Sequence, residues 1–483
     1  MPGTTPATKT RADRFADVMA FADAQRMRKT YAPGWFEEVE TELRRRMLEI
    51  ERDLTAEIMA AHDVDAAAVE IAGKVHRRVL RAEQTYMTAA GPVTVARWLY
   101  RDRDDDSAPS LSPVELRLGI IGDFWTRKAA KQALWVVAQM TPQKAAEAFE
   151  RVGSMQPSKS SLDRLPKLVS EEWEAEREVH EAALRDALVV PEGTVSIAVS
   201  IDGVLAPIDG GNRPVDVRNA AALEGRQSKG PAGYREVGCA TISFCDAEGE
   251  MLGAVRMART PEPNKRTLKA SLAAELCAAL RARPDLKIVK VADGVADNWT
   301  FLTDELPAGE EALDFFHAAE HLHAAIAAAY GDGTRETRYR FDELRDILRD
   351  DHGGVGRVIR ALDHLRSRYP QRVAIRQCAA YFRKHRRRMD YAGLVERKLP
   401  IGSGVVEAAC KTLVSQRLKL SGMRWGHGAQ AILTARGWDQ SDRFDKAWAL
   451  LAAHYQVDVH VLANVIPFKP PAPPKKPRAK RAG

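Results

Sequence analysis

The sequence predicts an α/β protein with a mixed sheet flanked by helices, an all-α insertion and a largely helical N-terminal region. Two observations support this fold class. From residue 192 to 323, strand-like and helix-like patterns follow one another in the order β-β-β-α-β-α-β-α, which is typical of a mixed sheet. The chain has 483 residues, of which 45% are hydrophobic, so it can bury a large core and should form several domains.

The N-terminal region, residues 1–120, is expected to be mostly helical with a short β element. Residues 1 to about 80 are predicted as helix, and the strongest stretch is FEEVETELRRRMLEIERDLTAEIMAAHDV, whose apolar residues recur every three or four positions. The segment GPVTVARWLYR, 91–101, has the alternation and β-branching of a strand.

Residues 121–190 are predicted to form short helices joined by tight turns. Helical patterns occur in FWTRKAAKQALWVVAQM, TPQKAAEAFERVG and SKSSLDRLPKLV, and Thr or Ser provides the N-caps. This organisation fits a helix-turn-helix DNA-binding region and fits a generic helical bundle equally well. We favour the DNA-binding interpretation because of the chemistry expected downstream.

The first part of the α/β core is assigned to 191–323. GTVSIAVSIDGVLAPI is expected to be a strand that ends at Asp202, and 234–259 to be two strands joined by a turn. A helix follows in NKRTLKASLAAELCAALRAR, then a short buried strand, LKIVKVADG, that ends at Asp293. ALDFFHAAEHLH is expected to be a last strand that runs into a helix.

The α/β rhythm is then interrupted by a helical insertion, 324–393, and resumes at IGSGVVEAACKTLVSQRLKL in a last core segment, 394–445. The C-terminal segment, 446–483, ends in PFKPPAPPKKPRAKRAG, which is Pro-rich and basic. We expect this tail to be disordered, because it has too few apolar residues to offset the entropy of ordering. It could contact nucleic acid or simply increase solubility.

Three acidic residues occupy comparable positions in the predicted core. Asp202 and Asp293 follow strand patterns and precede glycines, and Glu407 begins a helix behind Gly-Ser-Gly. Such positions can converge at one edge of a sheet, where clustered carboxylates suit Mg²⁺ or Mn²⁺. Taken singly, each has a simpler explanation, since Asp-Gly is a turn signal and Glu407 has the spacing of an ion pair with Lys411.

Together these residues resemble the DDE transposases with an RNase H-like catalytic domain, specifically the ISKra4-type transposases of bacterial insertion sequences. The resemblance covers about 190 to 440 and is carried by SIDGVLAP, VADGVADNW, LDFFHAAEHL and, most specifically, PIGSGVVEAACKTLVSQRLKLSGMRW. It implies that Asp202, Asp293 and Glu407 are catalytic and bind two Mg²⁺ or Mn²⁺ ions. It also implies an auxiliary pair, Asp314 and His317, that acts near the scissile phosphate or braces the site; a structural His at a strand–helix junction is the alternative.

The expected partner is double-stranded DNA: the terminal inverted repeats of the element and its target. The chain has a formal charge of +7, and basic residues gather in RKHRRR and after Glu407. Trp425 could stack on a base or could be a core residue. The predicted DNA contacts are Arg383, Lys384, Arg386, Arg387, Arg388, Lys411, Arg417, Lys419, Arg424 and Trp425.

Joining two DNA ends implies a homo-oligomer on DNA. The five cysteines lack CxxC spacing, and no apolar run has the length of a membrane span, so we expect a cytoplasmic, nucleoid-associated protein with no membrane partner.

Two competing functions remain. HAAEH, from His317 to His321, matches the H-x-x-E-H pattern of zinc peptidases. The strand pattern before it places His317 at the start of a helix, which disfavours that site. The second competitor is a transposase-derived protein that binds DNA without cutting it.

Overall fold

The structure is a computed structural model that describes residues 10–208, 233–426 and 428–462. The predicted disordered part of the basic tail lies outside these residues. Contacts divide the chain into two compact units. The first unit comprises Met1–Ala130, Phe149–Gln156 and Ala452–Gly483, and the second comprises Lys131–Ala148 and Pro157–Leu451. Within the described ranges, every helix is too short or too polar to span a membrane.

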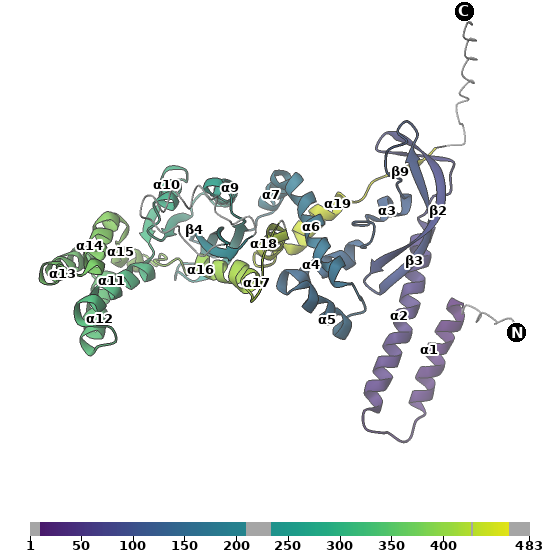
Figure 1. Ribbon diagram of the computed structural model, residues 1–483, viewed down its shortest axis with the longest axis horizontal. Helices are drawn as coiled ribbons and strands as arrows, with labels where there is room; N and C mark the ends of the chain where they lie inside the picture. The colour runs from purple at the N-terminus through teal and green to yellow at the C-terminus, as the bar shows by residue number, and fades with distance from the viewer. Residues whose placement is uncertain (1–9, 209–232, 427, 463–483) are drawn as a thin grey trace, which may run out of the picture. The chain divides into compact units, whose positions relative to one another are not determined.

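The first unit begins with two helices that lie side by side, α1 (Arg11–Arg26) and α2 (Trp35–Ala61) (Figure 1). Thr10 caps α1: its side chain accepts a hydrogen bond from the amide of Asp13, whose carboxylate accepts one from the amide of Thr10. The predicted N-terminal helical region is confirmed up to α2.

Most of the rest of the first unit is a four-stranded sheet. The helix predicted up to about residue 80 is wrong after Ala61, where α2 ends. The strand β2 (Lys74–Thr88) carries several exposed charged side chains, and most of its buried residues lie at its C-terminal end. Its sequence therefore lacks the regular alternation of apolar and polar residues that would predict a strand. Gly73, with φ 77°, makes the tight turn before it. The sheet order is β3-β2-β1-β9, antiparallel throughout. The other elements are β1 (Ala68–Ile71), β3 (Gly91–Asp102), α3 (Pro113–Leu118) and β9 (Val459–Val461).

The region predicted as helix-turn-helix-like is helical. Its helices are α4 (Arg127–Gln139), α5 (Pro142–Val152), α6 (Lys159–Ala175) and α7 (Arg177–Asp186). In the second unit α6 packs on α18 (Gly428–Asp439), where the rings of Trp173 and Trp438 meet edge to face at 4.5 Å. The DNA-binding role of this region stays a prediction.

The centre of the second unit is a five-stranded mixed sheet of order β6-β5-β4-β7-β8. The β6-β5 and β5-β4 pairs are antiparallel, and the β4-β7 and β7-β8 pairs are parallel. This arrangement confirms the RNase H-like fold class and the predicted order of elements. The strands are β4 (Ser196–Pro207), β5 (Tyr234–Cys245), β6 (Met251–Arg259), β7 (Lys287–Ala292) and β8 (Glu310–Leu313).

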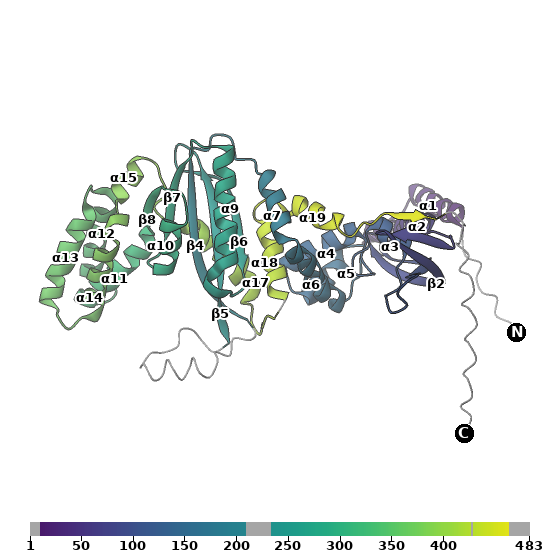
Figure 2. The ribbon, with the colours of Figure 1, turned by 90° about the horizontal axis from the view of Figure 1, so that it is seen from above.

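Helices cover this sheet on both faces. Figure 2 shows α9 lying along the strands. It contacts β5 and β6, and its leucines belong to the same buried cluster as Ile197, Val199 and Ile201 of β4. On the opposite face, α16 and the π-helical turn η3 contact β4 and β5. The bounds are η1 (Pro263–Lys265), α9 (Arg266–Ala282), α10 (Ala296–Asp304), α11 (Phe315–Tyr330), α16 (Gly404–Ala409), η3 (Cys410–Ser415), α17 (Gln416–Leu418) and α19 (Phe444–Ala453).

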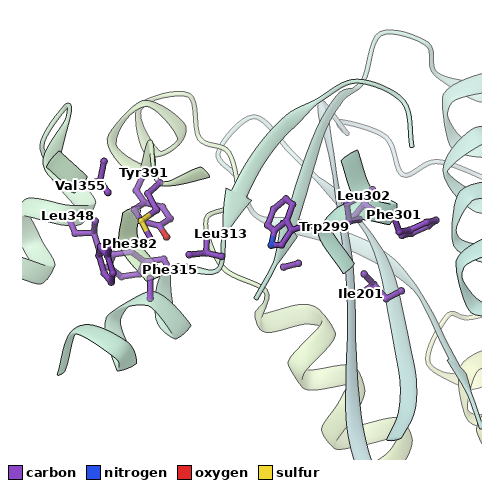
Figure 3. Packing of buried hydrophobic residues seen from close by; sticks show 14 of the residues in the cluster. Ile201, Trp299, Phe301, Leu302, Leu313, Phe315, Leu348, Val355, Phe382 and Tyr391 are labelled. Atoms are coloured by element: carbon purple, nitrogen blue, oxygen red, sulfur yellow. The ribbon is translucent and has the colours of Figure 1, made fainter. Parts of the chain in front are cut away.

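The predicted insertion is helical and shares its core with the sheet. One continuous cluster of buried apolar residues runs from β4 and α10 through Leu313 to the insertion (Figure 3). In the insertion, Leu348, Phe382 and Tyr391 belong to this cluster. After α11, the insertion consists of α12 (Arg335–Asp350), α13 (Gly354–Arg368), α14 (Val373–His385), η2 (Arg386–Arg388) and α15 (Tyr391–Glu396).

Candidate active site

The three predicted acids come from three elements of the second unit. Asp293 directly follows β7, and Glu407 lies in the first turn of α16, as predicted. Asp202 does not end its strand, because β4 continues to Pro207 in register with β5. The parallel pairing of β4 with β7 stops at Val199 and Lys290, so the β7 side of Asp202 is no longer occupied by a paired strand.

A cavity of about 320 Å³ brings these acids together. Asp202, Asp293 and Glu407 all line it, and so does His317, the predicted auxiliary residue. Its complete lining is Ile201, Asp202, Ala292, Asp293, Phe316, His317, Glu320, Ser403, Val406 and Glu407. Three of these residues were not predicted from the sequence as site residues: Glu320, Ser403 and Phe316. The i, i+3 spacing of Glu320 from His317 on one helix was the available signal.

Asp202 lies in an electrostatically unfavourable position. Burial raises the pKa of Asp202 above its ordinary value of 3.8, and the negative charge of Asp293 raises the pKa further. The Cys410 thiol donates to Asp202 Oδ2 at 3.7 Å, and Cys239 is the partner of Asp202 on β5. Burial and a neighbouring negative charge therefore both disfavour the ionised form of Asp202.

Glu407 is held by the loop that precedes it. The Ser403 hydroxyl donates to Glu407 Oε1 at 2.9 Å, one turn earlier on the chain. Gly402 allows the loop to approach α11, since a Cβ at this position would lie 2.7 Å from Phe316 Cε2. This steric requirement explains part of the Gly-Ser-Gly stretch without any need for chain flexibility.

Asp314 and His317, the predicted auxiliary pair, contact each other through the backbone of His317. Asp314, which is fully buried, accepts a hydrogen bond from the backbone amide of His317 at 2.6 Å and another from the amide of Ser403. The imidazole of His317 instead lies with Nδ1 3.8 Å from Glu320 Oε2. Asp314 therefore braces the backbone, and only His317 reaches the cavity.

The residue types of the cavity suit a hard divalent cation. Carboxylate oxygens are the preferred protein ligands of Mg²⁺ and Mn²⁺. In the described part of the chain, however, no three carboxylate, imidazole or thiol groups stand close enough together to hold a metal ion. The acids share a cavity without converging to ligand distances.

The H-x-x-E-H motif, His317 to His321, also lacks a complete set of metal ligands among the described residues. His317 is the third residue of α11, as its sequence context predicted, and its ring lies 5.0 Å from that of His321. Burial and the neighbouring His317 lower the pKa of His321. No third metal-ligating group accompanies this pair among the described residues.

Two predicted DNA-binding residues, Arg417 and Trp425, make their contacts within the protein. Arg417 is 1% exposed, donates to the carbonyl of Val137 and stacks on Trp425 at 4.8 Å. The Trp425 indole donates to the Leu418 carbonyl at 3.0 Å. We therefore no longer assign Arg417 to the DNA surface.

The remaining predicted contacts fall into two groups. Arg383 pairs with Asp363, and Arg388 pairs with Glu311 at 2.7 Å. The others have exposed side chains and can meet phosphates: Lys384, Arg386, Arg387, Lys411, Lys419 and Arg424.

Comparison with protein-family models gives no match for this chain, and comparison with curated proteins gives none either.

Proposed function

We propose that the protein is a DNA strand transferase of the transposase type, which cleaves the ends of a mobile DNA element and joins them to target DNA. The observation that carries the proposal is the shared cavity of Asp202, Asp293 and Glu407. These carboxylates come from distant parts of the sequence. Asp202 lies in β4 and Asp293 directly follows β7 of a sheet with the RNase H-like strand order, and Glu407 lies on α16, which contacts β4. A polynucleotidyl transferase needs several acids at one such edge.

Asp202, Asp293 and Glu407 are the residues that would hold Mg²⁺ or Mn²⁺. When bound, such ions supply Lewis acidity that favours attack of water or a 3′-hydroxyl on phosphorus and stabilises the leaving oxygen. The chain's own residues prepare this site. Cys410 orients one oxygen of Asp202, and Ser403 orients Glu407.

The proposed reaction has two in-line steps without a covalent enzyme intermediate. Water attacks the phosphodiester at the end of the element and releases a 3′-hydroxyl, which then attacks a phosphodiester of the target. His317 faces the cavity beside Glu320, where it can donate a hydrogen bond to a phosphate oxygen.

Exposed cations support DNA as the partner. Lys411, Lys419 and Arg424 follow Glu407 on the same stretch of chain, and their side chains are exposed. Phosphate pairing by such residues is sequence-independent and weakens with salt. Because two element ends must be joined, we expect the active form to be a homo-oligomer on DNA.

The decisive experiment uses purified full-length protein and labelled DNA that carries the inverted repeats bordering its coding sequence. We expect nicked and joined products with Mg²⁺ or Mn²⁺, and none with a chelator. Folded protein that binds this DNA but never cuts it would instead favour the DNA-binding alternative. Stoichiometric zinc together with hydrolysis of a peptide would favour the peptidase.

A further inference from the structure

The glycine after Asp293 is required by a close contact. A Cβ on Gly294 would lie 2.4 Å from Cε2 and 2.9 Å from the hydroxyl of Tyr381, a residue of α14 in the insertion. The φ of Gly294 is not in the left-handed region. The Asp-Gly pair therefore does more than form a turn: it lets an aromatic ring of the insertion press directly on the backbone beside the second acid.

A second contact reaches the same corner from η2. The guanidinium of Arg388 stacks on the ring of Trp299 at 4.0 Å, and the indole N–H of Trp299 donates to the carbonyl oxygen of Asp293 at 2.5 Å. Glu311 fixes Arg388 through an ion pair at 2.7 Å. Trp299 is 3% exposed, so this hydrogen bond is shielded from water.

Packing rather than hydrogen bonding holds Tyr381 in place. Its ring stacks on His321, with centroids 4.2 Å apart, and lies 4.8 Å from the ring of His385. Among the described residues, the Tyr381 hydroxyl and both ring nitrogens of His385 are buried without a hydrogen-bond partner. Because unpaired buried polar atoms lower stability, this arrangement is costly for the fold.

We propose that Tyr381 and Arg388 are positioning residues through which the helical insertion clamps the Asp293–Gly294 corner and so sets the place of the second acid. The proposal rests on the proposed function for the role of Asp293. It assigns the insertion a share in building the active site in addition to any contact with DNA. It also gives Arg388 a role other than the phosphate contact predicted from RKHRRR.

The test is hydrogen–deuterium exchange of residues 293–300, measured without metal or DNA. We expect Tyr381→Ala and Trp299→Phe to accelerate exchange there by about tenfold, since each removes a contact that protects the corner. Tyr381→Phe keeps the ring and loses only an unpaired hydroxyl, so it should exchange like the wild type. Residues 236–244 of β5 serve as the internal reference and should be unchanged in every variant.

Arg388→Lys provides a second route if Tyr381→Ala does not fold. Lysine keeps the charge opposite Glu311 but cannot stack as a planar guanidinium does. Exchange at wild-type rates in Trp299→Phe and Arg388→Lys would overturn the clamp. Equal acceleration in 293–300 and 236–244 would also overturn it, because that pattern indicates general loosening.

A calorimetric titration with Mn²⁺ tests whether the clamp positions the carboxylate of Asp293. We expect the variants that loosen 293–300 to bind Mn²⁺ about tenfold or more weakly, as is usual when a residue behind a ligand is lost. Unchanged Mn²⁺ affinity would overturn the positioning role. If the wild type never cuts DNA while the exchange result holds, the proposed function fails and the clamp stands.

Discussion

The buried carboxylate of Asp314 accepts a hydrogen bond from the backbone amide of Ser403, although 89 residues separate the two in the sequence. The same carboxylate caps α11 through the amide of His317. Asp314 therefore connects Ser403, in the loop before α16, to the first turn of α11, the helix that leads into the insertion. The core segments before and after the insertion are therefore joined at one side chain.

This relationship predicts a large effect of truncation. Asp314→Ala should lower the free energy of unfolding by about 2–4 kcal/mol, because one helix cap is lost and the Ser403 amide is left buried without a partner. Asp314→Asn keeps a hydrogen-bond acceptor and should lower the free energy of unfolding by clearly less. Urea unfolding of both variants measures the difference, and equal losses would contradict the assignment.

Glu407→Gln should reduce DNA cleavage by about 10³-fold or more, since a neutral amide is a poor ligand for a hard cation. The amide oxygen can still accept the Ser403 hydroxyl, so the loop should stay in place. Affinity for the DNA ends, measured by fluorescence anisotropy, should change less than about twofold. Simultaneous loss of binding and cleavage would indicate damaged folding instead.

Asp202→Asn should abolish cleavage and stabilise the protein. The pKa of Asp202 is raised in the folded state by burial and by Asp293, so folding stability falls as the pH rises through the range above 3.8 in which this group ionises. The variant lacks that penalty and should gain on the order of 1 kcal/mol at neutral pH. Thermal unfolding should show the gain shrinking toward pH 4; a gain independent of pH would refute this explanation.

Substitutions of Arg417 and Arg424 should have different effects on stability and DNA binding, although both arginines follow Glu407 in the sequence. Burial and the nearby Arg436 lower the pKa of Arg417 to about 10, and its guanidinium donates to the Val137 carbonyl. Arg417→Gln should therefore destabilise the fold by about 1–3 kcal/mol. Arg424→Gln should leave the melting temperature unchanged but reduce the salt dependence of DNA binding by about one counterion. If Arg417→Gln instead lowered the salt dependence of DNA binding and left the melting temperature unchanged, Arg417 would be a DNA contact.

His385 should make the protein sensitive to mild acid. Burial, chiefly, lowers the pKa of His385 from 6.5 to about 4, so the unfolded chain takes up the proton first and stability is lost as the pH falls from 6.5 toward 4. His385→Phe keeps a ring beside Tyr381 and should reduce the loss between pH 7 and pH 5 by on the order of 1 kcal/mol. Replacement of the exposed His364 by Gln is the matched control, and an equal effect there would exclude His385 as the cause.

The order of elements in the core was predictable because local patterns carry it. The strands 234–259, the helix after them and the buried strand before Asp293 all have clear periodicity in the sequence. In the N-terminal sheet only β3 was predicted. The strand β2 was missed because its charged side chains are exposed along most of its length, and β1 was missed because its partner β9 is far away in the sequence. Pairing between distant segments leaves no local signal.

The three acids of the candidate site could be predicted from the sequence, but the contacts of the residues around them could not. Glu407 behind Gly-Ser-Gly and Asp293 before a glycine could be recognised from the sequence. The burial of Arg417 could not, because it depends on the carbonyl of Val137, 280 residues away. For the same reason, Tyr381 gave no sign that it touches Gly294.

The continuous apolar cluster that runs from β4 into the insertion has a consequence for dissecting this protein. A shortened chain in which α12 to α15 were replaced by a linker would expose the inner side of α11 and Phe315 to water. Such a minimal version should be insoluble. The sheet and its inserted helices should instead melt in one cooperative step, as a single folding unit.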